Sequence, residues 1–205
     1  LDPMSRLELR RKIKELQRRI NTTMIYVTHD QAEALTLADK IAVMDFGVIV
    51  QYGDAQEVYE HPINEFVGFF LGNPGMNFIK GTLVGNYLDF GEFKYEVSDV
   101  ADILNKYGSE FKLGIRPEYI VVDKEPIKDA FRAKIDMIEK LGPISLLILS
   151  AGDVNFKAKV RAVGFKGGEE VYVYFPREKV HIYSSDGKLI IWRLFDSKFL
   201  KEKNR

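Results

Sequence analysis

The hydrophobic positions of the chain follow two different periodicities. Up to residue 71 the apolar residues recur at helical spacing or form short unbroken runs, whereas from residue 78 they form runs of strand length separated by Gly and Pro. The stretch Gly72-Asn-Pro-Gly-Met-Asn-Phe78 lies between the two regions and is rich in turn residues. This pattern predicts an α/β segment over residues 1–73 and a mostly β-stranded domain over residues 74–205.

The first region contains clear start signals for helices. Asp2-Pro3 supplies an N-cap residue and a proline at the first helical position, and predicts a helix that ends near Ile20. Asp54 and Asn64 are expected to cap two short helices, and Phe46-Gly47 predicts the turn of a β-hairpin. The other expected elements are a helix over 31–38, strands over 40–45 and 48–52, and helices over 55–59 and 65–71.

A polar corner that contains His29 and Asp30 follows the apolar run Met24–Val27. Such a run is typical of a strand buried on both faces of a parallel sheet. Open α/β sheets bind their ligands at the carboxyl ends of their strands. We therefore expect His29 at the end of this strand as a candidate functional residue, with Asp30 as the cap of the next helix. The simpler alternative is a histidine that is only hydrogen-bonded at a strand end.

The second region predicts many short strands and little helix. The expected strands cover residues 78–84, 87–90, 93–97, 111–115, 119–122, 131–139, 145–149, 155–163, 170–175 and 188–192, with one short helix over 99–107. Strands of this length and spacing predict small Greek-key barrels of the OB type. OB barrels often bind nucleic acids, and Lys157, Lys159 and Arg161 fall on one strand face. A stand-alone OB module that binds nucleic acid or a regulatory protein is therefore the alternative function.

Composition narrows the choice between these functions. The 30 basic residues are balanced by 30 acidic residues, which argues against a dedicated nucleic-acid-binding protein. Cysteine is absent, so disulfides and thiolate metal sites are excluded. No apolar run approaches the roughly 20 residues that span a bilayer, and we expect a soluble, cytoplasmic chain. Because residue 1 is Leu and not Met, we expect the natural N-terminus to lie elsewhere.

The helix predicted over residues 3–20 is strongly basic. Its charged residues are Arg6, Arg10, Arg11, Lys12, Lys14, Arg18 and Arg19, against Glu8 and Glu15. Charges between apolar positions at helical spacing are typical of a solvated helix face. We therefore expect these basic side chains to be exposed.

The corner around His29 resembles a known family. The sequence Val27-Thr-His-Asp-Gln-Ala-Glu-Ala34, continuing to Leu37-Ala-Asp-Lys-Ile41, resembles the switch region, or H-loop, of ATP-binding cassette (ABC) ATPases, in the form found in carbohydrate importers of the maltose type. The resemblance implies that His29 contacts the γ-phosphate of ATP. An imidazole suits this role because one nitrogen can donate while a neighbour fixes the other. Leu1-Asp2 resembles the end of the D-loop, which implies that Asp2 helps to position the opposite subunit's nucleotide site.

The resemblance covers nearly the whole chain. Its further motifs are Ile41-Ala-Val-Met-Asp-Phe-Gly47, Gln51-Tyr-Gly-Asp54, Val58-Tyr-Glu-His-Pro62, Phe66-Val-Gly-Phe-Phe70, the linker Gly72–Phe78, Lys112-Leu-Gly-Ile-Arg-Pro-Glu118 and Glu139-Lys-Leu-Gly142. The linker departs from the family pattern at Asn73 and Gly75. The resemblance implies an α/β remnant of an ABC nucleotide-binding domain over residues 1–73 and an OB-like TOBE regulatory domain over residues 74–205.

The sequence lacks the motifs that hold ATP in this family. It contains no Gly-rich loop that ends in Gly-Lys-Ser/Thr, no Leu-Ser-Gly-Gly-Gln signature and no apolar strand that ends in Asp-Glu. We therefore expect the chain alone to bind no ATP tightly and to hydrolyse none. His29 and Asp2 are the candidate catalytic residues, His29 is the candidate cofactor-binding residue, and no metal ligands are expected.

The resemblance also implies how the intact subunit works. It would bind ATP and Mg²⁺, pair with a second subunit, and drive permease subunits that import sugars or sugar-like solutes. It would lie in the cytoplasm, on the inner face of the membrane. Because Leu1–Leu71 supplies too little structure to cover a two-sided strand, we also expect this chain to self-associate as a two-fold dimer.

Overall fold

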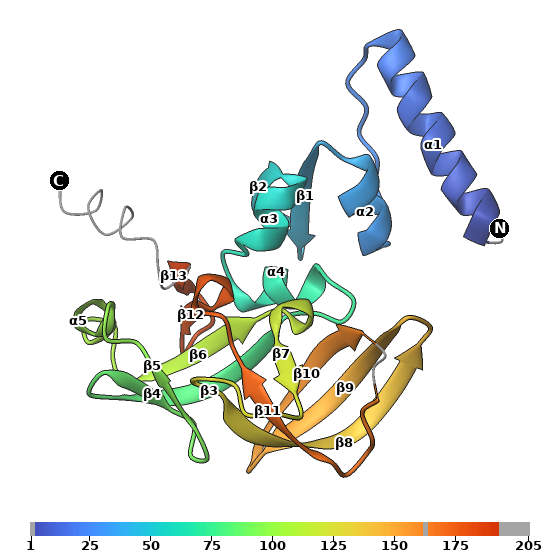
Figure 1. Ribbon diagram of the computed structural model, residues 1–205. Coiled ribbons are helices and arrows are strands. Elements are labelled where there is room, and N and C mark those ends of the chain that lie inside the picture. Colours follow the sequence, from blue (N-terminus) through green and yellow to red (C-terminus); the bar gives the residue numbers. More distant parts are fainter. Residues whose placement is uncertain (1–2, 162–163, 193–205) are drawn as a thin grey trace.

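A computed structural model describes residues 3–161 and 164–192 of the chain. Figure 1 shows a barrel-like β region with a smaller helical part above it and one helix that stands apart. The first part contains α1 (Pro3–Ile20), α2 (Gln31–Leu37), β1 (Lys40–Asp45), β2 (Val48–Asp54), α3 (Ala55–Glu60) and α4 (Glu65–Phe70).

The β region begins directly after the linker. Its elements are β3 (Asn77–Val84), β4 (Tyr87–Asp89), β5 (Lys94–Glu96), α5 (Ala101–Leu104), β6 (Glu110–Ile115), the 3₁₀ turn η1 (Pro117–Tyr119), β7 (Val121–Asp123), β8 (Phe131–Leu141), β9 (Ile144–Ala151), β10 (Val154–Arg161), β11 (Glu170–Tyr174), η2 (Arg177–Lys179), β12 (His181–Ser184) and β13 (Leu189–Trp192).

Local signals account for the short elements of the first part. A carboxylate oxygen of Asp30 accepts a hydrogen bond from the Glu33 backbone N–H, and the amide oxygen of Asn64 accepts one from the Val67 N–H. Both residues therefore cap their helices as expected. Asp54 is the N-cap residue of α3, although its side chain makes no capping hydrogen bond. The hairpin β1–β2 turns at residues 46–47, where both φ angles are positive, as the favoured two-residue hairpin turn requires.

The predicted strand over Met24–Val27 is wrong for this chain. Residues 22–28 run between α1 and α2 without strand pairing, and the side chains of Ile25 and Val27 are 93% and 90% exposed. A parallel strand exists only where neighbours accept and donate its backbone hydrogen bonds, and no described segment does so here. The apolar run therefore lies on the surface.

Two antiparallel sheets share the main hydrophobic core. One has the strand order β10-β9-β8-β11-β7, and the other has the order β13-β12-β6-β3-β4-β5. The core between them includes a cluster of four aromatic rings, from Phe93, Phe131, Phe156 and Phe175. The all-β expectation for this region is confirmed. Two details differ: α5 is shorter than the helix expected over 99–107, and the sequence pattern missed β12.

The side chain of Asn77 joins the two sheets. Its amide nitrogen donates to the Lys157 carbonyl at 2.9 Å and to the Ile115 carbonyl at 3.2 Å, and its amide oxygen accepts from the Lys157 N–H at 2.8 Å. Since β10 is the last strand of its sheet, Asn77 satisfies backbone groups that an edge strand would otherwise leave unpaired.

The helical part is attached to the β region through α3 and α4. Buried His181 contacts the Glu60 carbonyl at 2.7 Å, and the Tyr183 hydroxyl donates to the Pro62 carbonyl at 3.0 Å. Lys112 forms an ion pair with Glu65. The predicted division into domains at residues 73 and 74 stays a prediction, and these contacts run across it.

Candidate functional site

His29 lies at a bend between the extended segment 22–28 and the first residue of α2. Its side chain is exposed and has no hydrogen-bond partner within residues 3–161 and 164–192. The residues on both sides of it are fixed by hydrogen bonds, because the Asp30 N–H donates to the Thr28 hydroxyl oxygen at 3.0 Å. The corner therefore holds its backbone in place and leaves the imidazole available to a ligand.

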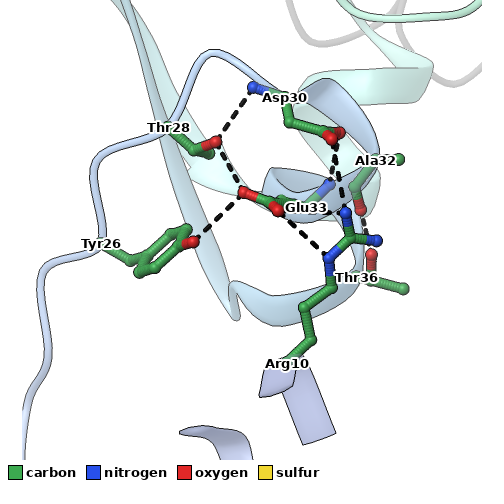
Figure 2. Close-up of polar contacts among 7 residues, drawn as sticks. All are labelled: Arg10, Tyr26, Thr28, Asp30, Ala32, Glu33 and Thr36. Carbon is green, nitrogen blue, oxygen red and sulfur yellow. Dashed lines mark hydrogen bonds and ion pairs between the residues drawn. The ribbon is translucent and has the colours of Figure 1, made fainter. Parts of the chain in front are cut away.

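Glu33, in the first turn of α2, organises this corner (Figure 2). One carboxylate oxygen of Glu33 accepts from the Thr28 hydroxyl at 2.8 Å and from the Tyr26 hydroxyl at 3.2 Å. Donation from Thr28, followed by donation from Arg10, holds the pKa of Glu33 below its usual value. The hydrogen bond from the Tyr26 hydroxyl to Glu33 raises the pKa of Tyr26, because loss of the proton would break this bond and leave a phenolate beside a carboxylate.

Arg10 of α1 closes the corner from the other side. Its Nη2 lies 3.0 Å from a Glu33 carboxylate oxygen and 3.3 Å from an Asp30 carboxylate oxygen, and its side chain is only 20% exposed (Figure 2). The expectation of a fully solvated basic face is therefore wrong at Arg10, although it holds for Arg11 and Lys12, whose side chains are mostly exposed. A helix face viewed alone cannot reveal a partner that lies 20 residues further along the chain.

A second contact connects the corner to the linker. The side-chain oxygen of Gln31 accepts from the Gly72 N–H at 2.9 Å. The two residues that follow His29 are thus tied to distant segments, Asp30 to Arg10 of α1 and Gln31 to Gly72 of the linker. Neither partner was recognised in the sequence, since both bonds depend on how distant segments pack.

The chemistry of the His29 side chain is compatible with the predicted phosphate contact. An exposed imidazole at a fixed corner can donate a hydrogen bond to a phosphate oxygen, so His29 fits this contact. Asp2, the other candidate residue, lies outside the described residues. Within the described part of the chain, no group of three or more His, Cys, Asp or Glu side chains could hold a metal ion.

The structure also bears on membrane insertion. Of the helices within residues 3–161 and 164–192, none combines the length and apolarity needed to cross a bilayer.

Comparison with protein families agrees with this architecture. The profile of the MalK OB fold domain matches residues 72–120, and that of the TOBE domain matches residues 113–182. The matched regions begin at the linker and include β3 to β11 and the first two residues of β12. The fold thus places the chain in the class of proteins that carry MalK-type OB and TOBE domains, here preceded by an α/β segment.

Individual relatives narrow the class. The chain is 38% identical over 202 residues to the trehalose/maltose import ATP-binding protein MalK of Thermococcus litoralis. The alignment covers 93% of this chain and 54% of that protein. It is 37% identical to the oligosaccharides import ATP-binding protein MsmX of Bacillus subtilis, with 93% and 55% covered. It is 34% identical to the sn-glycerol-3-phosphate import ATP-binding protein UgpC 1 of Rhizobium johnstonii, with 93% and 52% covered.

The chain belongs to the family of ABC importer ATP-binding subunits of the MalK type. It spans about half the length of the curated relatives it matches.

Proposed function

We propose that this chain is the C-terminal portion of the ATP-hydrolysing subunit of an ABC importer for sugars or sugar-like solutes. The observation that carries the proposal is the His29 corner, where an exposed imidazole projects from a backbone fixed on both sides. The relatives' names support the solute class, and they include both sugar and glycerol-phosphate importers.

In the intact subunit, ATP with Mg²⁺ would supply the phosphoanhydride bond whose hydrolysis drives transport. His29 would donate a hydrogen bond to a γ-phosphate oxygen, and Asp2 would help to position the opposite subunit's nucleotide site. Arg10 and Glu33 would keep the corner in place while the nucleotide is exchanged. No other residue of this chain is assigned to the nucleotide, because the sequence contains no phosphate-binding loop.

The role of His29 can be tested in the full-length subunit. A contact that matters most in the transition state affects kcat more than nucleotide affinity, so His29→Ala should lower kcat strongly and leave nucleotide binding nearly unchanged. Steady-state phosphate release and nucleotide titration measure the two quantities. His61→Ala is the matched control, because His61 lies near His181 and Trp192 and away from this corner. An unchanged kcat in His29→Ala would contradict the proposal.

The chain alone is expected to be inactive. A phosphate loop supplies most of the backbone donors to the phosphates, and the chain has none. Phosphate release from Mg-ATP should equal that of a buffer blank. Turnover that persists through purification and disappears in His29→Ala would defeat this expectation.

We also propose that the chain self-associates, as a two-fold dimer, and that permease subunits are its partners in the intact transporter at the inner face of the membrane. The exposed apolar side chains of Ile25, Val27 and Phe46 support the first point, since they are 93%, 90% and 100% exposed. Sedimentation at micromolar concentration tests it. A monomer throughout that range would contradict the dimer.

A further inference from the structure

The structure contains an open depression that the proposed transport function does not use. It has a volume of about 380 Å³ and lies where the helical part meets the β region. Its lining comes from α3, the linker, η1, β9 and β10, and consists of Tyr59, Asn73, Glu118, Ile144, Lys159, Val160 and Arg161. A volume of this size accommodates a small metabolite.

Two cations line the depression without an acceptor. Lys159 and Arg161 are two residues apart on β10, so both side chains project from the same face of the strand. Neither forms an ion pair or hydrogen bond with any other residue in the described part of the chain. Lys159 is partly exposed and Arg161 is exposed, so both side chains can reach a ligand in the depression.

The one carboxylate in the lining is already engaged. Glu118 accepts a hydrogen bond from the Tyr59 hydroxyl at 2.5 Å, and it makes no ion pair with Lys159 or Arg161. The neighbouring Arg116 guanidinium covers the Tyr59 ring and helps to neutralise the Glu118 charge. The two β10 cations are therefore not neutralised by Glu118 and remain available to a ligand.

The rest of the lining suits a hydroxyl-bearing compound. The Asn73 amide offers both a donor and an acceptor, and Glu118 has a second oxygen that can accept from a hydroxyl. Ile144 adds an apolar surface for carbon atoms. We propose that this depression binds a small phosphorylated sugar or polyol, with its phosphate on Lys159 and Arg161 and its hydroxyl groups near Asn73 and Glu118.

The binding is measurable on this chain and does not depend on the proposed ATPase role. Titration with glucose-6-phosphate at low salt, followed by calorimetry and amide chemical shifts, should give saturable binding with shifts at Asn73 and Arg161. Lys159→Gln and Arg161→Gln should each weaken it about tenfold or more, as expected for a lost charge-assisted hydrogen bond. Both positions are at the surface, so unfolding midpoints should stay unchanged.

Lys157→Gln is the matched control. Lys157 projects from the same strand face but does not line the depression, and its side chain forms no ion pair with a described residue. Its removal should leave the affinity unchanged. Equal weakening by Lys157→Gln, or no saturable binding of glucose-6-phosphate, would overturn the proposal.

Two further ligands separate the parts of the proposal. Inorganic phosphate should bind at the same place more weakly than glucose-6-phosphate, and glucose should not bind detectably. Equal affinity for both phosphates would overturn the role given to Asn73 and Glu118. Tighter binding of a single-stranded oligonucleotide, weakened equally at all three β10 cations, would overturn the small-ligand site in favour of nucleic-acid binding along the strand.

Discussion

The Arg116 guanidinium lies 3.5 Å from the centre of the Tyr59 ring and donates to the Tyr59 backbone carbonyl with Nε at 3.1 Å. A second branch of the same side chain donates to the Leu71 carbonyl at 2.5 Å. Arg116 is only 1% exposed, and this burial lowers its pKa. Three hydrogen bonds to carbonyls stabilise the buried charge, and the face of the Tyr59 ring adds a cation–π contact. Arg116 therefore fastens the end of α3 and the end of α4 to the β region.

Replacing Arg116 with Met should destabilise the chain by about 3 kcal/mol, because the Tyr59 and Leu71 carbonyls lose their donors inside the protein. Arg116→Lys should recover part of the loss, since an ammonium group keeps the charge but lacks the planar fork. Urea unfolding measures both. Arg132→Met is the control, at an exposed residue of β8, and should change stability by less than about 0.5 kcal/mol. A similar effect in both Met variants would contradict the role given to Arg116.

Asn77→Ala should loosen the junction between the two sheets and reduce stability by about 2–3 kcal/mol, because it removes three side-chain hydrogen bonds of about 1 kcal/mol each. Asn77→Asp separates the two bonds to Lys157, because a carboxylate can still accept from the Lys157 N–H but cannot donate to the Lys157 carbonyl. Amide hydrogen exchange at Lys157 should accelerate in Asn77→Ala and much less in Asn77→Asp. Exchange that is equally fast in both variants would contradict the bonding described here.

Arg10→Gln should release α1 from the corner without unfolding the protein. Each of its ion pairs is partly exposed and contributes only about 0.5 kcal/mol, so global stability should change by less than about 1 kcal/mol. Local protection of α1 amides should fall, and proteolysis within residues 21–28 should accelerate. Arg11→Gln is the control, since Arg11 pairs only with exposed Glu15 on the same helix. Equal proteolysis rates in the two variants would show that Arg10 does not fasten the helix.

Acidification should release α1 from the corner around His29. The pKa of Glu33 is lowered in the folded chain, so its contacts stabilise the fold above the usual value of 4.5 and are lost as the pH falls through the lowered pKa. We therefore expect the α1 amides to lose protection as the pH falls below 4.5 and through the lowered pKa of Glu33, while the β region stays folded. Glu33→Gln should remove this pH-dependent loss of α1 protection. If the loss persists in Glu33→Gln, another group is responsible for it.

Local sequence signals determined the helices, the hairpin and most of the strands. Asp30 and Asn64 cap their helices, and Phe46-Gly47 makes its turn, because these features depend on a few neighbouring residues. The motif around His29 likewise identified the candidate site, since its residues are adjacent in sequence. Strand β12 was missed because its run His181–Ser184 is short and includes polar residues at both ends.

Tertiary structure alone decided which distant residues meet. Three contacts join residues far apart in the sequence: Arg10 with Glu33, 23 residues apart, Tyr59 with Arg116, 57 apart, and Asn77 with Lys157, 80 apart. No periodicity predicts such pairs, because each depends on how elements pack. At Met24–Val27 a local pattern was misleading. Its apolar residues predicted a buried strand, but a strand needs hydrogen-bonding partners, and the described chain provides none. The sequence by itself thus determined most of the local elements and singled out His29 as a candidate, although it placed His29 after a strand that does not form. Packing decided what holds that corner and where the β10 cations meet the helical part.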